Sequence, residues 1–547
     1  METISVALIL LLAVVISGAL ARMSPIALPL PLFFQIALGV VIASVANLGV
    51  ELEPEIFFLL FLPPLLFLDG WRIPKEGVFR DKGTILELAF GLVVFTVVGV
   101  GFLVNWMIPA MPLAVAFALA AIVSPTDPIA VSAIAARVPI PKRLMHILEG
   151  ESLLNDASGL VCMRFAVAAT LTGTFSLAEA AGTFLWVAIG GIAIGTGVTW
   201  SATKAKNWIS RKFGEETGSQ ILISLLIPFA AYLLAERLHC SGILAAVAAG
   251  ITMSYVEQTG QALAVTRVRR SAVWDTVQFT ANGIIFVLLG EQLPQILAGA
   301  AQVVHETGHH EPAWLLVYVV SINLALAALR LLWVWTSLRF TLFRAARRGE
   351  ALVTPSWRLI AAMSLAGVRG TITLAGVLTL PLVMADGTAF PARDLAIFLA
   401  AGVIILSLVA ASIGLPHLLK GLELPPEPSH QEDEDRARIA ASEAAIRAVE
   451  RAQHDMGEGR SDADLYVDAG ARIMELYRQR IDGRSKTGEE RDLARKIDEI
   501  ERRLRLAGLR AERDEIYRIV RSRSLTDEAA RKLVREVDLL EARFRVT

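Results

Sequence analysis

Apolar residues arrive in blocks along residues 1–420, separated by short connections that contain charges, Pro or Gly. A block of about 20 apolar residues has the length that spans the hydrocarbon core of a bilayer. The blocks predict thirteen spans, which begin near residues 4, 26, 55, 84, 111, 147, 180, 218, 241, 273, 313, 356 and 394. We therefore expect an all-α polytopic membrane protein in the lipid bilayer. Its first block reads as an uncleaved span, because no basic region precedes it.

Composition divides the chain into two unlike parts. The 547 residues are 54% hydrophobic and carry a net charge of -1. Residues 1–424 hold the apolar blocks and form the predicted transmembrane exchange domain, whereas residues 425–547 alternate basic and acidic side chains and read as a cytoplasmic helical tail. In the tail segment 492–509, Leu and Ile recur at intervals of three and four residues. Such a stripe packs against its own hairpin, a second copy or a partner. The tail is therefore either a regulatory element or a solvated helical hairpin without a signalling role.

Basic residues fix the predicted orientation. With the N-terminus outside, the inner connections hold 21 Lys and Arg residues, whereas the outer ones hold two, Arg237 and Arg393. Cytoplasmic loops of membrane proteins are enriched in Lys and Arg. We therefore predict an outer N-terminus and a cytoplasmic tail in the plasma membrane. The alternation also supports the number of spans, because one missed span would have scrambled it.

Two spans are interrupted in a similar way. SPTDPIAV at 124–131 places Pro125 and Pro128 in the middle of span 5, and AGVRGTITLAG at 366–376 places Gly367, Arg369 and Gly370 in the middle of span 12. These are the fifth spans of two six-span sets that run in opposite directions. Paired interrupted helices in inverted halves mark the central site of a transporter. The alternative is that Pro and Gly are simply common in membrane helices.

The string GESLLNDA at 150–157 supplies the leading candidate site. Asp156 is a carboxylate within an apolar span, where an ionised group is expensive and usually functional. Ser152 lies four residues earlier on the same helical face, with Asn155 beside it. A sodium ion needs several oxygen ligands, so we predict a sodium site formed by Asp156, Ser152, the Thr126 carbonyl or hydroxyl, and water. Because Asn155 is not a second carboxylate, we expect one-for-one, electroneutral exchange.

Other charged residues in the spans are candidates for supporting roles. Asp127 resembles a helix N-cap followed by Pro128, and Arg369 could lie against freed carbonyls at a half-helix end; for both, holding the fold and touching the ion are equally open. Asp69 is a second carboxylate near the site or a cap. Intramembrane ionisable residues usually pair with one another, although the sequence names no pairs among Glu87, Arg164, Asp275 and Arg330.

The strings GESLLNDA, SPTDP, LPPLLFLD, KGTIL and GVRGTITLA together resemble sodium/proton exchangers of the monovalent cation/proton antiporter family, in its electroneutral Asn-Asp branch. The resemblance covers about residues 1–420. It implies about thirteen helices in two inverted six-helix repeats with two unwound crossing helices, and usually a homodimer in which a mobile core domain moves against a dimerisation domain.

Carried over residue by residue, the resemblance makes Asp156 the carboxylate for which sodium and a proton compete. Ser152 and Thr126 become ligands, and Asn155 a support. It further implies that Glu151 pairs with Arg369 and that Asp127 neutralises the crossed half-helices. Asp69 falls near a position that is a glutamate in some relatives, which leaves its role open.

The predicted function is therefore secondary antiport of sodium, with potassium or lithium as alternatives, against protons, for pH and cation homeostasis. It requires no cofactor and no nucleic acid, and no pairing of nucleophile and base suggests an enzyme. Two other classes stay open. A cation channel would follow voltage and ignore a pH gradient, and a transport-dead sensor would signal through the tail.

Overall fold

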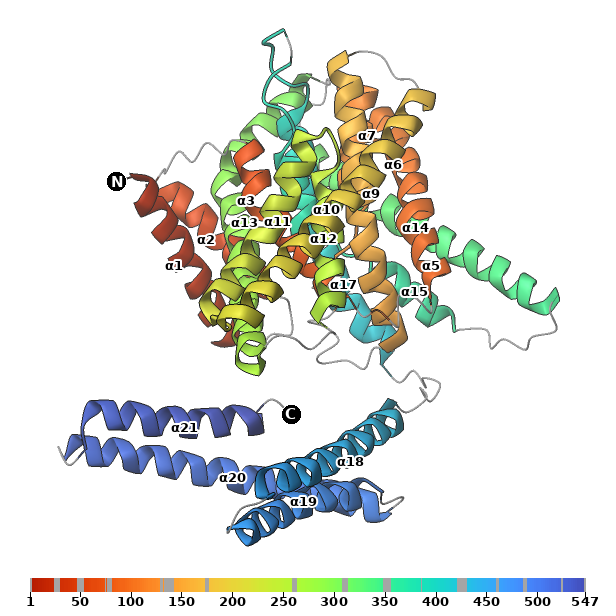
Figure 1. Cartoon of the computed structure of the whole chain (residues 1–547). Helices are drawn as coiled ribbons and strands as arrows, with labels where there is room; N and C mark the ends of the chain where they lie inside the picture. Colours follow the sequence, from red (N-terminus) through yellow and green to blue (C-terminus); the bar gives the residue numbers. More distant parts are fainter. Residues whose placement is uncertain are drawn as a thin grey trace. The chain divides into compact units, whose positions relative to one another are not determined.

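The computed structural model describes residues 2–23, 30–46, 54–73, 75, 81–127, 131, 142–172, 177–257, 263–306, 313–347, 356–384, 386–420, 430–458, 462–485, 489–522 and 525–545. The chain divides into two compact units, a membrane unit (Met1–Glu423) and a tail unit (Leu424–Thr547). Both are helical (Figure 1).

Apolar helices make up the membrane unit. Its elements are α1 (Glu2–Met23), α2 (Leu30–Ala46), α3 (Pro54–Arg72), α5 (Lys82–Leu86), the π-helical turn η1 (Glu87–Leu92), α6 (Val93–Met107), α7 (Leu113–Val123), α9 (Lys142–Thr172), α10 (Leu177–Phe213), α11 (Thr217–Arg237), α12 (Gly242–Glu257), α13 (Ala264–Glu306), α14 (Ala313–Arg347), α15 (Trp357–Leu365), α16 (Thr371–Leu378) and α17 (Arg393–Leu419).

Seven helical segments among the described residues are long and apolar enough to cross a membrane: Ile4–Met23, Lys82–Met107, Leu185–Phe213, Thr217–Arg237, Ala264–Ala298, Ala313–Phe340 and Arg393–Leu419. Three shorter apolar helices, Pro31–Val45, Leu113–Val123 and Gly242–Glu257, accompany them. A multi-pass membrane protein follows from their length and composition.

Glycines bring several helix backbones into direct contact. A Cβ atom on Gly39 of α2 would lie 2.1 Å from a carbonyl oxygen of α13, and one on Gly290 of α13 would lie 2.0 Å from a carbonyl oxygen of α2. Gly70 of α3 and Gly250 of α12 meet the opposite helix in the same way, at 2.5 and 2.0 Å. Small residues allow such close approach in membrane helix pairs. The α3–α12 contact fixes the end of α3 that carries Asp69.

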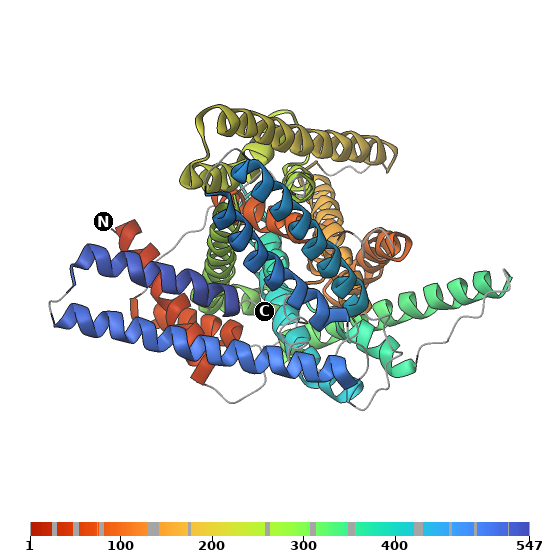
Figure 2. The same cartoon turned by 60° about the horizontal axis from the view of Figure 1, so that its bottom comes forward.

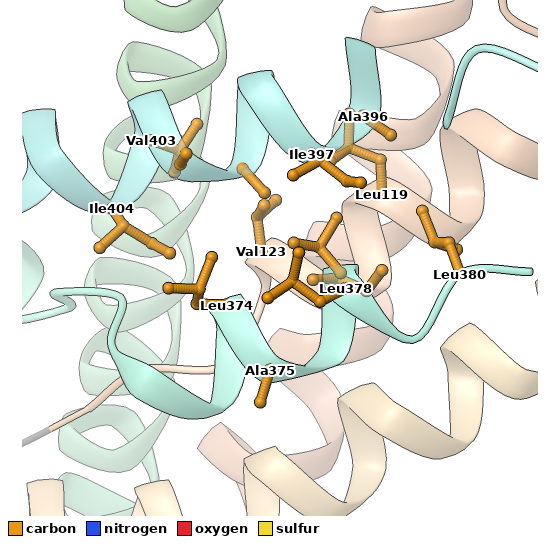
Figure 3. Close-up of a cluster of buried hydrophobic side chains, with 14 of the residues drawn as sticks. Leu119, Val123, Leu374, Ala375, Leu378, Leu380, Ala396, Ile397, Val403 and Ile404 are labelled. Atoms are coloured by element: carbon orange, nitrogen blue, oxygen red, sulfur yellow. The ribbon is translucent and has the colours of Figure 1, made fainter. Parts of the chain in front are cut away.

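The two interrupted segments meet in the middle of the membrane unit. α7 ends at Val123, and the backbone N–H of Asp127 donates to the carbonyl of Val368 (2.7 Å), in the non-helical stretch between α15 and α16. Leu119 of α7, Leu378 of α16 and α17 side chains form the apolar layer behind this crossing (Figure 3). Pro128 and most of the remainder of predicted span 5 lie outside the described residues.

The tail unit consists of α18 (His430–Gly457), α19 (Ala463–Ser485), α20 (Glu489–Arg521) and α21 (Asp527–Arg545). α20 and α21 run side by side (Figures 1 and 2). Between them, Leu509 and Ile516 of α20 are buried against Ala530 and Val537 of α21. Arg513 adds ion pairs to α21, to Glu541 and, at 2.8 Å, to Asp538. α20 and α21 therefore have a small apolar core of their own.

Candidate ion-binding site

A cavity of about 410 Å³ lies beside the crossing of the interrupted segments. It brings together five of the residues predicted from the sequence, Asp69, Thr126, Asp127, Ser152 and Asp156. The remaining lining comes from α3, α9, α13 and the start of α16: Leu65, Arg72, Ile73, Glu149, Leu153, Gln278, Asn282, Gly370, Thr371, Ile372 and Thr373. Three of the five predicted residues are carboxylates, so the cavity suits a cation.

Asp156 and Ser152 form the wall contributed by α9. Their spacing of four residues places them one turn apart on the same helical face, and both side chains line the cavity. Both residues are buried. A carboxylate oxygen and a hydroxyl oxygen thus lie together on one cavity wall, where both can coordinate a hard cation.

Thr126 is held in place by two buried side chains of α9. Its hydroxyl donates to Glu151 Oε1 (3.3 Å) and accepts from Asn155 Nδ2 (3.0 Å). The Thr126 hydroxyl has therefore used its proton and one lone pair on the protein, and one lone pair is left for a cation. Asn155 does not line the cavity in this structure; it positions Thr126.

Glu151 forms its ion pair with Arg330 of α14. The prediction that Glu151 pairs with Arg369 was therefore wrong. The Arg330 guanidinium donates to both carboxylate oxygens of Glu151, with 2.7 Å between Nη2 and Oε2. The exposed fractions of the two side chains are 2% and 1%. Arg330 also donates through Nε to the Met363 carbonyl of α15 (3.2 Å). A Cβ on Gly367 would lie 2.8 Å from Arg330 Cδ, so the break at Gly367 makes room for this arginine.

Arg369 is instead bound to backbone carbonyls. Its Nε donates to the carbonyl of Val123, the last residue of α7 (2.8 Å), and its Nη1 donates to the carbonyl of Gly367. The last carbonyls of a helix lack intrahelical partners and form its negative end. Arg369 therefore places its positive charge at the C-terminal end of α7.

Asp127 lies at the opposite kind of helix end. Its Oδ2 accepts from the backbone N–H of Thr371, the first residue of α16 (3.4 Å). Next to it, a Cβ on Gly370 would lie only 1.8 Å from Asp127 Oδ2. Anionic side chains are stabilised at helix N-termini. Asp127 and Arg369 thus compensate half-helix ends of opposite sign at the crossing, whereas the N-cap predicted for Asp127 in its own span falls on residues outside the described part.

A polar stripe of α13 faces the site from the other side, and the sequence did not point to it. Gln278 and Asn282 line the cavity, one helical turn apart. Arg72 of α3 donates to Gln278 Oε1 (2.8 Å) and pairs with Asp275 on the same stripe. Asn282 Oδ1 is buried with no hydrogen-bond partner among the described residues. The signal in the sequence was the helical spacing of Asp275, Gln278 and Asn282 within an apolar block.

Two further intramembrane charges lie away from the cavity. Arg164 pairs with Glu236 at 3.0 Å, whereas Glu87 is exposed at the first position of the π-helical turn η1. In the part of the chain that the structure describes, no group of three or more His, Cys, Asp or Glu residues is arranged to hold a metal ion. The carboxylates that line the cavity are therefore not grouped tightly enough for three of them to bind one metal ion.

Comparison with known families gives this geometry its context. Residues 8–421 match the family described as sodium/hydrogen exchanger, transmembrane. The chain belongs to this family. The resemblance predicted from the sequence strings is thereby confirmed, and with it a multi-pass membrane protein of the antiporter class.

Relatives extend over nearly the whole chain, tail included. An uncharacterized Na(+)/H(+) exchanger of Escherichia coli strain K12, YjcE, is 42% identical over 99% of both chains. A sodium, potassium, lithium and rubidium/H(+) antiporter of Bacillus pumilus is 36% identical, over 99% of this chain and 78% of the relative. Among solved structures, the sodium proton antiporter MjNhaP1 of Methanocaldococcus jannaschii shares the fold, with a TM-score of 0.56, 18% identity, and coverage of 77% of this chain and 99% of that one.

Proposed function

We propose that this protein exchanges sodium for protons across the plasma membrane by alternate occupation of Asp156. Family membership supports sodium/proton antiport. The observation that carries the residue-level mechanism is the cavity in which the Asp156 carboxylate, the Ser152 side chain and Thr126 lie together. A buried carboxylate binds either a cation or a proton, and the two compete. Such transport needs neither a cofactor nor an enzymatic step.

The cation is coordinated by Asp156, Ser152 and Thr126, with water completing the shell. The single proton of the Thr126 hydroxyl is donated to Glu151, so an oxygen lone pair rather than a proton faces the site. Asn155 and the Glu151–Arg330 pair keep Thr126 in this orientation. Potassium and lithium are alternative cargoes, in keeping with the name of the Bacillus pumilus relative.

Exchange is one-for-one and electroneutral. Four carboxylates line the cavity, those of Asp69, Asp127, Glu149 and Asp156, and Asp127 compensates the N-terminus of α16. We assign exchange to Asp156, which shares its helical face with Ser152, and its neighbour Asn155 adds no second exchangeable charge. One sodium ion and one proton therefore replace each other without net charge movement.

The architecture we propose around this site has thirteen spans in two inverted six-helix repeats, with the N-terminus outside and residues 425–547 as a cytoplasmic tail. The breaks after α7 and between α15 and α16 stand at the fifth span of each repeat, which supports the repeat. Residues 1–424 form the exchange domain and pair as a homodimer. Its mobile core moves the Asp156 site between the two sides of the membrane.

Proteoliposome exchange tests the mechanism. In vesicles with an outward sodium gradient, the wild-type chain is expected to acidify the lumen, because each sodium ion that leaves is replaced by a proton that enters, at a rate independent of an imposed voltage. Asp156→Asn should abolish the signal. Asp394→Asn is the matched control, because it is the same substitution at an exposed position at the start of α17. Exchange that persists in Asp156→Asn, or that follows voltage, contradicts the mechanism.

A further inference from the structure

An apolar seam runs along the N-terminal half of α20. It consists of Leu493, Ile497, Ile500 and Leu504, whose exposed fractions are 60%, 55%, 49% and 67%. Large apolar side chains that cluster on one exposed face usually mark an interaction surface. These four are spaced by four, three and four residues, so they form one continuous line on the helix.

The seam is separate from the face of α20 that packs on α21. Leu509 and Ile516 are the residues of α20 buried in that core. An α-helix turns by about 100° per residue, so Leu504 and Leu509 point in directions about 140° apart. Docking of α21 therefore leaves the seam uncovered, and its occupant has to come from elsewhere.

The spacing of the seam is that of a two-stranded coiled coil. Alternating steps of three and four residues give the 3.5-residue repeat in which a and d positions face a partner helix. Ile497 and Leu504 then occupy a positions, and Leu493 and Ile500 occupy d positions. Ala507 and Ala511 continue the same register as smaller residues.

Charges beside the seam select a partner and a direction. Lys496 falls at a g position and Glu501 at the following e position. In a parallel pair of identical helices, each Lys496 meets the Glu501 of the other copy, in two symmetric contacts. An antiparallel pair centred on the same four apolar residues would set Lys496 against Arg503, a like charge.

We propose that the seam of α20 binds the seam of a second copy of this chain as a short parallel coiled coil. Two heptads are too short to hold free helices together. Chains already paired through their membrane units present the two tails to each other at high effective concentration, which removes that limit. The coiled coil thus rests on the proposed homodimer and adds a second, tail-borne contact to it.

Cysteine cross-linking of the full-length chain in membranes tests the seam. In a background with Cys162→Ala and Cys240→Ala, the Ile497→Cys and Leu504→Cys variants are expected to form disulfide-linked dimers under mild oxidation. Asp498→Cys, one residue along on an exposed part of the same helix, is the matched control and should stay uncross-linked. Light scattering of the unoxidised full-length chain, extracted into detergent, reports whether it is dimeric without any disulfide.

Further variants test the charges. Lys496→Glu should lower the cross-linking yield of Leu504→Cys by a few-fold, and adding Glu501→Lys should restore it. A dimeric chain in which Ile497→Cys cross-links no better than Asp498→Cys overturns the seam and leaves the membrane dimer standing. Cross-linking between Ile497→Cys and Ile500→Cys chains in preference to identical chains overturns the parallel arrangement. A monomeric chain overturns both the seam and the homodimer.

Discussion

Removal of the buried Arg330 side chain should destabilise the membrane unit strongly. Arg330→Met keeps the volume of the side chain approximately but leaves the Glu151 carboxylate, which is 1% exposed, without its bidentate partner. Breaking a buried ion pair from one side costs about 3–5 kcal/mol, because the remaining charge is buried and uncompensated. The Thr126 hydroxyl, at 3.3 Å, is a weak substitute for a guanidinium.

The double variant Glu151→Gln/Arg330→Met should recover most of that loss. Replacing both members of a buried pair removes both charges, and such replacements are often close to neutral. A glutamine at 151 also keeps an oxygen that can accept from Thr126. The two single substitutions are therefore expected to be strongly non-additive, as contacting residues are.

Thermal unfolding in detergent, followed by tryptophan fluorescence, measures these effects. The control cycle combines Glu151→Gln with Arg369→Met, because Arg369 is bound to backbone carbonyls rather than to Glu151. The expected result is strong coupling of Glu151 to Arg330 and weak coupling to Arg369. Equal or reversed coupling would refute the pairing and would return Arg369 as the partner of Glu151.

Two smaller substitutions address the crossing and the site. Gly370→Ala places a methyl group 1.8 Å from Asp127 Oδ2 and 2.4 Å from Asp127 Cβ, so the whole Asp127 residue has to shift and its carboxylate leaves the N-terminus of α16, at a cost of at least about 0.5–2 kcal/mol. An unfolding midpoint equal to that of Gly197→Ala, a glycine with open space around it, would show that nothing had to move. Ser152→Ala removes a proposed ligand from the cavity wall and should raise the apparent KM for sodium, measured by exchange in vesicles, roughly tenfold, whereas Ser152→Thr should stay near wild type. Equal KM values for the Ala and Thr variants would exclude the hydroxyl as a ligand.

Local features of the sequence were enough to find the centre of the site. Asp156 stands out because a carboxylate in an apolar block is expensive, and Ser152 follows from helical spacing alone. The breaks at Pro125 and Gly367 were visible because these residue types disrupt helices wherever they stand. Each of these inferences uses residues close together in the chain.

Features that depend on packing between distant helices were not predictable in this way. Glu151 and Arg330 are 179 residues apart. The described residues include two other buried arginines, Arg270 and Arg369, and only the packing of α14 against α15 places Arg330 at this carboxylate. Gln278 and Asn282 escaped notice because neutral polar residues occur in membrane helices without carrying the cost of a charge. Their place on the cavity wall depends on how α13 is rotated.

Competition between sodium and a proton at Asp156 is tested most directly by the apparent KM for sodium as a function of pH in vesicles of the wild-type chain. A single competing proton predicts that this KM rises as pH falls, approaching roughly tenfold per pH unit, with an unchanged maximal rate. A KM that is the same at every pH, with only the maximal rate changing, would contradict a shared site.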